Sequence, residues 1–348
     1  MTPSQFRILS QDFDRIVSTL GDRLNIVSGS TIVITGCCGL IGSYFVDLFA
    51  YLNISLFKNP VKIIGIDNGL VGKWDRIEHL NGRSDVKIIK SDLGGVEFDY
   101  HVDWLINAAG VASPVLYKQF PVQTMQATVL GLWNLLEHRF DGLSGLLHFS
   151  SSEVYSDPDI LPTPETYVGR VSTIGPRSSY DSSKCFSETL CRIYYEQFGV
   201  PVKIVRPFNV YGAGHRLDDG RIIPQLMKSL MTGEKFPIHG DGSATRSYCY
   251  LSDAATQLLA VLLDGQNGEV YNVGDGTSEI SVADLVKTAQ EIFDGKPEVE
   301  FFEDKSPLTD APTRRRPDVS KVLKLVSAPE VGLKEGLVRT FEWHRGEG

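Results

Sequence analysis

Residues 31–49 have the sequence TIVITGCCGLIGSYFVDLF, in which a β-branched run is followed by a glycine-rich turn and then by an apolar stretch. The run before Gly36 predicts a buried strand, and the stretch after Gly42 predicts a helix. Gly36, Gly39 and Gly42 lie in the turn between them, where glycine lets the backbone bend tightly and approach a phosphate, and the helix N-terminus offers free amide donors. The segment therefore predicts a dinucleotide-binding turn.

Short strands and helical stretches continue to alternate beyond this turn. Further strand-like runs occur at 61–67 (VKIIGID), 102–109 (VDWLINAA), 146–152 (LLHFSSS) and 202–208 (VKIVRPF). This alternation predicts βαβ units and hence an α/β fold with a Rossmann-like, doubly wound parallel sheet. In such a sheet, ligands bind at the carboxyl ends of the strands.

The second strand ends in Asp67 and Asn68, and this ending indicates which dinucleotide binds. An acidic side chain here accepts hydrogen bonds from both adenosine ribose hydroxyls and repels the 2′-phosphate of NADP, so we predict NAD as the cofactor. A plain Asp-Asn turn is the alternative interpretation. Asp92, after the following strand, is expected near the adenine. Further expected cofactor contacts are Leu40, Ile41 and Ala108.

Three parts of the chain differ in composition and in the spacing of their apolar residues. In residues 1–29 the apolar residues recur at helical spacing, and no catalytic or binding motif is visible. This pattern predicts an N-terminal helical extension. Residues 30–207 form the predicted NAD-binding Rossmann domain. Glycine- and proline-rich loops interrupt shorter elements in residues 208–348, which we predict to be mainly a smaller, interleaved substrate-binding lobe. A strand near 269–274 is expected to return to the main sheet.

A helix predicted over residues 178–198 carries Tyr180 and Lys184 four residues apart, so both lie on one helix face. A tyrosine with its ordinary pKa of about 10 is a poor base, but positive charge from a lysine and an oxidised nicotinamide stabilises its phenolate. We therefore expect Tyr180 to accept a hydroxyl proton while hydride leaves the same carbon. Both residues are also expected to contact the cofactor, and Ser151 lies nearby at the end of a strand.

Bulk composition narrows the classes of partner. The 348 residues carry a net charge of −9, which argues against nucleic acid as a partner. No apolar run approaches the ~20 residues that cross a bilayer, so we expect no membrane partner and a cytoplasmic location. The five cysteines have neither CxxC spacing nor paired histidines, so no disulfide framework and no metal site is predicted.

Six sequence blocks carry a specific family resemblance. They are GCCGLIG (36–42), NAAG (107–110), SSSEVY (150–155), YDSSK (180–184), RPFNVYG (206–212) and GDGSATRSYCYLSD (240–253). They resemble the extended short-chain dehydrogenase/reductase family of nucleotide-sugar epimerases, dehydratases and decarboxylases, from about Ser30 to about Trp343. The resemblance implies that Asn209, Arg221 and Arg246 hold the diphosphate of a nucleotide sugar, a task that suits the planar guanidinium.

Further blocks resemble those members of the family that decarboxylate UDP-glucuronate. These are ASPVLY (112–117), SSSEVYSDP (150–158), ETYVGRVSTIGPRSSYDSSK (165–184), LDDGR (217–221) and RRRPDVSK (314–321). In this resemblance Glu153 matches the glutamate beside the catalytic serine or threonine, here Ser151. Arg315 matches the arginine near the substrate carboxylate. Tyr117 and Ser152 are expected to contact the substrate as well.

The reaction that this resemblance implies needs groups that the chain has at the matching positions. Oxidation at C4 of the sugar creates a ketone β to the C6 carboxylate, which is then lost as carbon dioxide. Tyr180 and a serine hydroxyl stabilise the oxyanion that develops on the C4 oxygen. Protonation at C5 and return of the hydride give UDP-xylose and regenerate NAD.

Several positions depart from the family pattern. Cys37 and Cys38 occupy a turn that is usually small and apolar, Asn107 replaces a frequent histidine, Ser156 replaces a common glycine, and Cys185 follows the lysine in place of a basic residue. None of these changes removes a group that the chemistry needs. They leave open a substrate with a different sugar or a different nucleotide.

Other functions fit parts of the pattern. A 4,6-dehydratase carries an Asp-Glu pair where this chain has Ser152 and Glu153. The reaction of a 4-epimerase does not require Glu153 and Arg315, so it would not explain their presence. A protein that binds NAD without catalysis has no need of the intact Tyr180 and Lys184.

A homodimer is also expected. The predicted helix at 180–198 and the apolar helix at 122–138 resemble the pair that forms a four-helix interface in this family.

Overall fold

A seven-stranded parallel sheet forms the centre of the molecule in our computed structural model, which describes residues 1–303 and 313–346. In spatial order its strands are β11 (Val270–Val273), β6 (Val202–Pro207), β5 (Gly145–Phe149), β4 (Trp104–Asn107), β1 (Thr31–Thr35), β2 (Lys62–Asp67) and β3 (Val86–Lys90). The chain order reverses between β1 and β4, which creates the crevice where ligands of such sheets bind. The predicted doubly wound α/β fold is confirmed.

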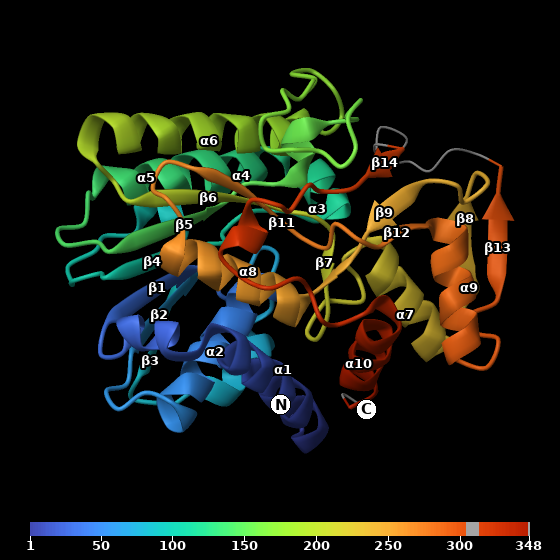
Figure 1. Cartoon of the computed structure of the whole chain (residues 1–348), viewed down its shortest axis with the longest axis horizontal. Coiled ribbons are helices and arrows are strands. Elements are labelled where there is room, and N and C mark those ends of the chain that lie inside the picture. Colours follow the sequence, from blue (N-terminus) through green and yellow to red (C-terminus); the bar gives the residue numbers. More distant parts are fainter. Residues whose placement is uncertain (304–312, 347–348) are drawn as a thin grey trace.

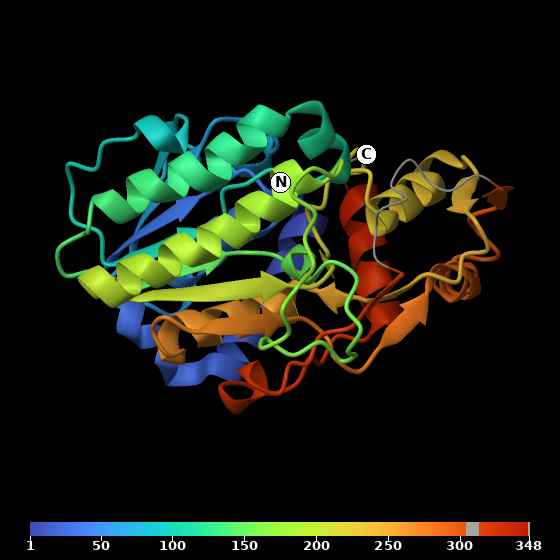
Figure 2. The ribbon, with the colours of Figure 1, turned by 90° about the horizontal axis from the view of Figure 1, so that it is seen from above.

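Helices cover both faces of this sheet (Figure 1). One layer contains α1 (Pro3–Leu20), α2 (Leu40–Ser55) and α8 (Leu251–Asp264); the other contains α4 (Pro121–Met125), a π-helical stretch (Gln126–Leu130), α5 (Gly131–Glu137) and α6 (Ser178–Phe198), with α3 (Pro114–Gln119) beside it. Figure 2 shows α5 and α6 side by side above the strands. Because both faces are covered, the inner strands are mainly apolar, and all residues of β4 and β5 are buried, including the polar Asn107 and His148.

A smaller lobe lies beyond the carboxyl ends of the strands, at the right of Figure 1. Its elements are β7 (Val210–Tyr211), α7 (Ile222–Thr232), β8 (Phe236–His239), β9 (Thr245–Ser247), β10 (Cys249–Tyr250), β12 (Glu279–Ser281), α9 (Val282–Ile292), β13 (Val299–Phe302), β14 (Arg314–Arg315) and α10 (Leu333–Arg345). Between them the chain returns to the main sheet, where β11 pairs with β6. In β14, Arg315 pairs with Arg246 of β9, which brings the two arginines to one edge.

The first and last helices are tied together by a buried ion pair. Asp12 of α1 is fully buried and accepts a hydrogen bond of 2.6 Å from Arg339 of α10, and the Tyr250 hydroxyl donates to it over 3.1 Å. Burial raises the pKa of Asp12 to about 6, although Arg339 opposes the shift. Breaking such a pair on one side costs about 3–5 kcal/mol, so the helical N-terminal segment is anchored to the smaller lobe. None of the described helices is both long and apolar enough to cross a bilayer.

Candidate active site

The glycine-rich turn after β1 has the shape that a phosphate requires. Gly36 has a φ of +66°, and a Cβ added there would lie 2.8 Å from the Ala108 carbonyl oxygen. A Cβ on Gly42 would lie only 2.1 Å from the Gly36 carbonyl oxygen. Gly39 is the N-cap of α2, whose first amides have no carbonyl partner within the helix. Only glycine fits at Gly36 and Gly42, and the helix end offers donors to an anion.

This turn lines one end of a cavity of about 800 Å³ between the sheet and the smaller lobe. The predicted cofactor contacts that line the cavity are Gly36, Gly39, Leu40, Ile41, Gly42, Ala108, Tyr180 and Lys184. The predicted substrate and catalytic residues that line it are Tyr117, Ser151, Ser152, Glu153, Asn209, Arg221, Arg246 and Arg315. One hollow thus brings together residues from both parts of the chain.

Asp67, Asn68 and Asp92 lie beside the turn and are not among the residues that line this cavity. Both carboxylate oxygens of Asp67 accept backbone N–H groups, from Cys38 over 2.9 Å and from Gly69 over 2.8 Å. Burial raises the pKa of Asp67, and these amide donors oppose the shift. The Asn68 amide donates to Asp92 over 2.6 Å, which links the two residues at the edge of the sheet.

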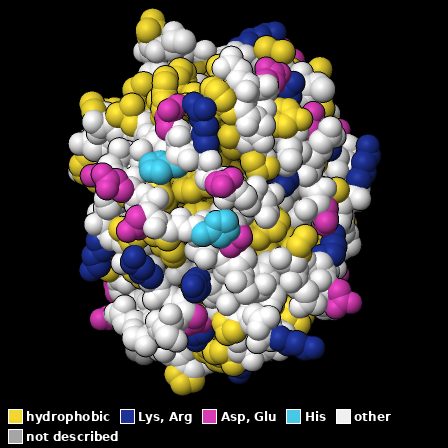
Figure 3. All heavy atoms as spheres, turned by 90° about the vertical axis from the view of Figure 1, so that its left-hand side faces the viewer, with side chains coloured by type: hydrophobic (Ala, Val, Ile, Leu, Met, Phe, Trp, Pro, Cys, Tyr) yellow, Lys and Arg dark blue, Asp and Glu magenta, His cyan; other side chains and the backbone are white. Residues whose placement is uncertain are grey.

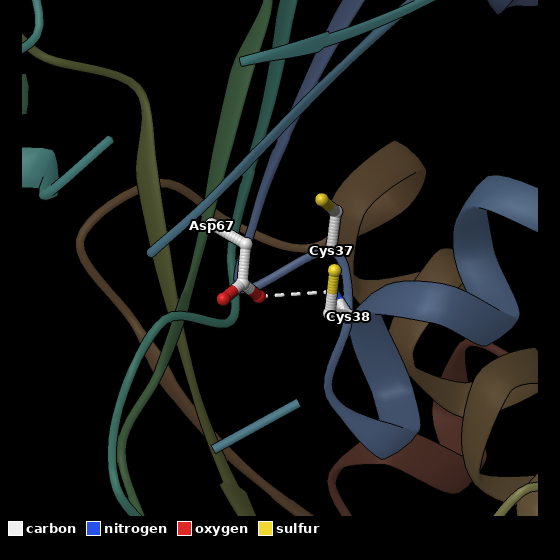
Figure 4. A group of neighbouring side chains, drawn as sticks. All are labelled: Cys37, Cys38 and Asp67. Carbon is white, nitrogen blue, oxygen red and sulfur yellow. Dashed lines mark hydrogen bonds between the residues drawn. The ribbon is translucent and has the colours of Figure 1, made fainter. Parts of the chain in front are cut away.

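Cys37 and Cys38 are both buried in the turn (Figure 4). Their sulfur atoms and an Asp67 oxygen lie within 4.8 Å of one another. Figure 4 shows the Asp67 carboxylate directed at the backbone of Cys38, where the hydrogen bond forms. The aspartate therefore supports the conformation of the turn through its backbone.

Tyr180 and Lys184 project from α6 into the cavity, beside the end of β5. The Lys184 ammonium donates to the Phe149 carbonyl oxygen over 2.6 Å, and burial lowers its pKa to about 8. The Tyr180 ring stacks on Tyr117, with ring centroids 5.2 Å apart and an interplanar angle of 11°. Burial raises the pKa of Tyr180 to about 12, while a hydrogen bond with Ser151 lowers it. With this pKa, Tyr180 is a neutral phenol.

The serines after β5 have separate partners. Ser150 donates a short hydrogen bond to Glu188, which also holds Arg206 over 2.6 Å. Ser151 accepts the Glu153 amide over 3.2 Å and faces Tyr180. Among these serines, Ser151 is thus the one placed to share a substrate oxygen with Tyr180.

A cluster of charged side chains lies beyond Tyr180, at what we call the sugar end of the cavity. Arg315 donates from both terminal nitrogens to the two carboxylate oxygens of Glu153, one contact being 2.7 Å. Arg177, the residue before α6, also forms an ion pair with Glu153. Burial alone would raise the pKa of Glu153, but the two guanidinium groups hold it at about 2. Glu153 is therefore ionised.

Two members of this cluster had no assigned role in the sequence: Arg177 and Asp181. The Asp181 carboxylate lies 3.4 Å from Nε of Arg177. Burial raises the pKa of Asp181 to about 7; Glu153 adds to this shift and Arg177 opposes it. Both residues belong to the block GPRSSYDSSK that carries Tyr180. Their proximity to this tyrosine in the sequence was the signal that could have identified them as site residues.

The remaining predicted substrate contacts lie toward the smaller lobe. Arg221 is paired with Asp219 over 2.9 Å, and Asn209 donates to the Ser247 carbonyl oxygen over 3.1 Å. Arg246 donates to the Thr245 carbonyl oxygen over 2.7 Å, and burial lowers its pKa to about 10, with repulsion from Arg315 in the same direction. Basic residues that line the cavity are Lys73, Arg76, Arg177, Lys184, Arg216, Arg221, Arg246 and Arg315. A chain with a net charge of −9 thus contains a basic hollow that suits an anionic ligand.

Comparison with known proteins agrees with this geometry. The family model described as "NAD dependent epimerase/dehydratase family" matches residues 32–274. UDP-glucuronic acid decarboxylase 6 of Arabidopsis thaliana is 35% identical over 89% of this chain and 87% of its own length. UDP-glucuronic acid decarboxylase 1 of Xenopus tropicalis is 33% identical over 91% of this chain and 72% of its own.

The fold is also similar to that of solved structures. A UDP-glucuronic acid 4-epimerase from Bacillus cereus, crystallised with UDP-glucuronic acid and NAD, superposes with a TM-score of 0.79. It is 24% identical, and the match covers 91% of this chain and 100% of the epimerase chain. This likeness concerns the fold.

Proposed function

The chain belongs to the NAD-dependent epimerase/dehydratase family, and from this premise we propose that it decarboxylates UDP-glucuronate to UDP-xylose through transient oxidation at C4. The observation that carries the proposal is the ion pair between Glu153 and Arg315, next to Tyr180 in a basic cavity. A guanidinium at this position suits a sugar that carries a carboxylate. The preceding residue is Ser152, which lacks the acid of a dehydratase, and the relatives that are 33–35% identical are named UDP-glucuronic acid decarboxylases.

The residues around the glycine turn fit NAD as the cofactor. The missing Cβ atoms of Gly36 and Gly42 let the backbone approach a pyrophosphate, and the start of α2 supplies amide donors. Asp67 stands at the end of β2, where a carboxylate meets the adenosine ribose and disfavours a 2′-phosphate. When bound, the cofactor supplies a reversible oxidant for the C4 hydroxyl of the sugar.

Tyr180 and Ser151 act on the C4 oxygen. Tyr180 takes the hydroxyl proton during oxidation and gives it back at the end of the cycle. Its raised pKa means that the phenol form dominates at rest, so the positive charge of Lys184, 5.8 Å from the ring centroid, is needed for the phenolate. The Ser151 hydroxyl shares the same oxygen and keeps it in place.

Carbon dioxide leaves from the ketone because the carboxylate is then β to a carbonyl group. The electron pair moves from the breaking C5–C6 bond onto the C4 oxygen, where Tyr180 and Ser151 donate hydrogen bonds to the oxyanion. A proton then adds to C5 in place of the lost carboxylate, and reduction of the C4 ketone, with the Tyr180 proton given back to the C4 oxygen, yields the pentose. Glu153, ionised and held by two arginines, fixes the positions of the groups around C5 and C6.

The product mass tests this proposal. Incubated with NAD and UDP-glucuronate, the protein is expected to release a nucleotide sugar that is lighter by one carbon dioxide. An unchanged mass with altered chromatographic mobility would indicate an epimerase, and loss of water from a UDP- or dTDP-hexose would indicate a dehydratase. Either result in the absence of decarboxylation contradicts the proposal.

The homodimer is the second part of the proposal. Large apolar side chains are exposed along α4, the π-helical stretch, α5 and α6: Val122, Met125, Leu130, Trp133, Phe186, Ile193 and Phe198. Figure 3, which faces the end of the molecule where α5 and α6 finish, has hydrophobic side chains gathered in its upper half. Apolar side chains exposed along neighbouring helices suit a second copy of the same surface.

Light scattering tests the assembly. A homodimer is expected at micromolar concentration, and Trp133→Arg should shift the mass toward the monomer because the charge would be buried in the interface. A parent protein that stays monomeric would contradict the dimer without touching the proposed reaction.

A further inference from the structure

Two guanidinium groups contact one glutamate at the sugar end, and the proposed reaction gives Arg177 no contact with the substrate of its own. Arg315 comes from β14 in the smaller lobe, whereas Arg177 directly precedes the helix that carries Tyr180. Their side chains are 6% and 12% exposed, so both charges are largely removed from bulk water. Glu153 neutralises only one of the two positive charges. The pair of arginines therefore retains a positive charge that Glu153 does not match.

Buried polar atoms in the same cluster lack partners. Within the described residues, Nε of Arg315 is buried and forms no hydrogen bond, and Oδ1 of Asp181 is buried without a partner as well. Buried donors of a guanidinium are rarely left unsatisfied in a folded protein. An acceptor with negative charge that enters beside Glu153 would satisfy the Arg315 donor, and Arg177 lines the same part of the cavity.

Asp181 determines how much positive charge is left. The charged and titratable groups that interact electrostatically with Asp181 come from α6, the residue before it, η5 (Ser152–Tyr155), β14 and α3. They are Tyr180, Cys185, Arg177, Glu153, Arg315 and Tyr117. When Asp181 is neutral, Glu153, Arg177 and Arg315 together carry one net positive charge. When Asp181 ionises, that charge is cancelled.

We propose that Arg177 and Arg315 together bind the carboxylate of the substrate, and that Asp181, 3.4 Å from the Arg177 guanidinium, sets the net positive charge of this arginine pair. This inference rests on the proposed function and adds to it a second specificity-determining arginine. The substrate class is a nucleotide sugar with a carboxylate at C6. A neutral sugar gains nothing from Arg177.

Binding of two ligands that differ at C6 tests the role of Arg177. The full-length protein, loaded with NAD and carrying Tyr180→Phe to prevent turnover, is titrated with UDP-glucuronate and with UDP-glucose by calorimetry. Arg177→Ala should weaken UDP-glucuronate about ten- to a hundredfold, the usual effect of one hydrogen bond to a charged group, and leave UDP-glucose within about twofold. Arg170→Ala is the matched control, because Arg170 is 76% exposed and paired only with the surface residue Asp159 in the described structure.

The outcomes separate the two proposals. Equal weakening of both ligands, or no weakening of either, overturns the role of Arg177 while the proposed reaction stands. Arg177→Lys keeps the charge and guards against misfolding, and it should recover part of the affinity for UDP-glucuronate alone. If the protein with Tyr180 intact neither binds nor converts UDP-glucuronate, the proposed function fails and this inference fails with it.

A pH series tests Asp181. Affinity for UDP-glucuronate should fall several-fold as the pH rises from 6 to 8, because ionised Asp181 then cancels the charge of the arginine pair. Asp181→Asn should bind UDP-glucuronate equally well across this range. Lys184 has a pKa of about 8, and its titration should change the affinity for both ligands equally. UDP-glucose therefore serves as the internal control for Lys184. A slope that survives in Asp181→Asn contradicts the role of Asp181 in setting the charge of the arginine pair.

Discussion

At one end of the cavity a single turn, Gly36–Gly42, supplies the groups for a phosphate, whereas at the other end the charged side chains come from three distant segments. The cofactor end depends on backbone shape: glycines without a Cβ and free amides at the start of α2. The sugar end depends on side-chain charge, with Glu153 from η5, Arg177 from the position before α6 and Arg315 from β14 brought together.

This difference predicts how each end fails. A backbone site fails when an atom is added, because the neighbouring carbonyl groups cannot move far. A charge cluster fails when one charge is removed, because its buried partners are left unmatched. Variants at the two ends should therefore change different quantities. Substitutions at the cofactor end should lower cofactor affinity and stability, whereas substitutions at the sugar end should lower turnover and change sugar selectivity.

The largest effect is expected from Tyr180→Phe, at the boundary between the two ends. Loss of the hydroxyl removes the proton acceptor for the first oxidation, so turnover should fall by about a thousandfold or more. NAD affinity should stay close to that of the parent, since the ring and its stacking on Tyr117 remain. Steady-state kinetics and NAD titration measure the two quantities. Tyr51→Phe, whose hydroxyl contacts Asp14 at the surface, is the control.

Glu153→Gln should separate kcat from KM. The amide keeps the shape but leaves Arg177 and Arg315 without their counter-charge. We expect kcat to fall about a hundredfold, while the KM for UDP-glucuronate does not rise, because the arginines become more available to the substrate. Glu196→Gln, in an exposed pair with Arg192, is the control. A rise in KM with unchanged kcat would show that Glu153 serves binding alone.

The same contrast explains what the sequence could predict. The glycine turn and the Tyr180–Lys184 pair each lie within one short segment, where strand, turn and helix periodicity fix their geometry. Asp67 and Arg315 were placed by their position after a strand or in a family block. Arg177 was missed because nothing local marks an arginine before a helix as an ion-pair partner of Glu153, 24 positions earlier in the chain.

Electrostatic details were also beyond the sequence. A tyrosine near a lysine suggests a lowered pKa, yet the structure surrounds Tyr180 with apolar groups and raises it to about 12. Likewise Asp181 resembles an ordinary helix-surface carboxylate until Glu153 and the surrounding burial are known. Such shifts depend on what the tertiary fold packs around the group.

At the cofactor end, Gly36→Ala should lower NAD affinity about tenfold or more and destabilise the fold by about 1–3 kcal/mol. The new Cβ would lie 2.8 Å from the Ala108 carbonyl oxygen, at a φ of +66° that alanine rarely adopts. Calorimetry with NAD and thermal unfolding measure the two effects. Gly82→Ala is the control, because its φ of +84° is similar and no atom lies within 4 Å of its Cβ position. It should show the conformational cost alone, with NAD affinity intact.

The smallest effect concerns the choice between NAD and NADP, and it tests whether the backbone end also uses a charge. The parent should prefer NAD, since ionised Asp67 repels a 2′-phosphate. Asp67→Asn removes the charge and keeps one oxygen that can still accept the Cys38 amide, so the turn should survive while the preference narrows by about tenfold. Asp264→Asn, in an exposed pair with Arg23, controls for a general change of charge. If the parent binds both cofactors equally, Asp67 acts only through the Cys38 and Gly69 amides, and the cofactor end is purely a backbone site.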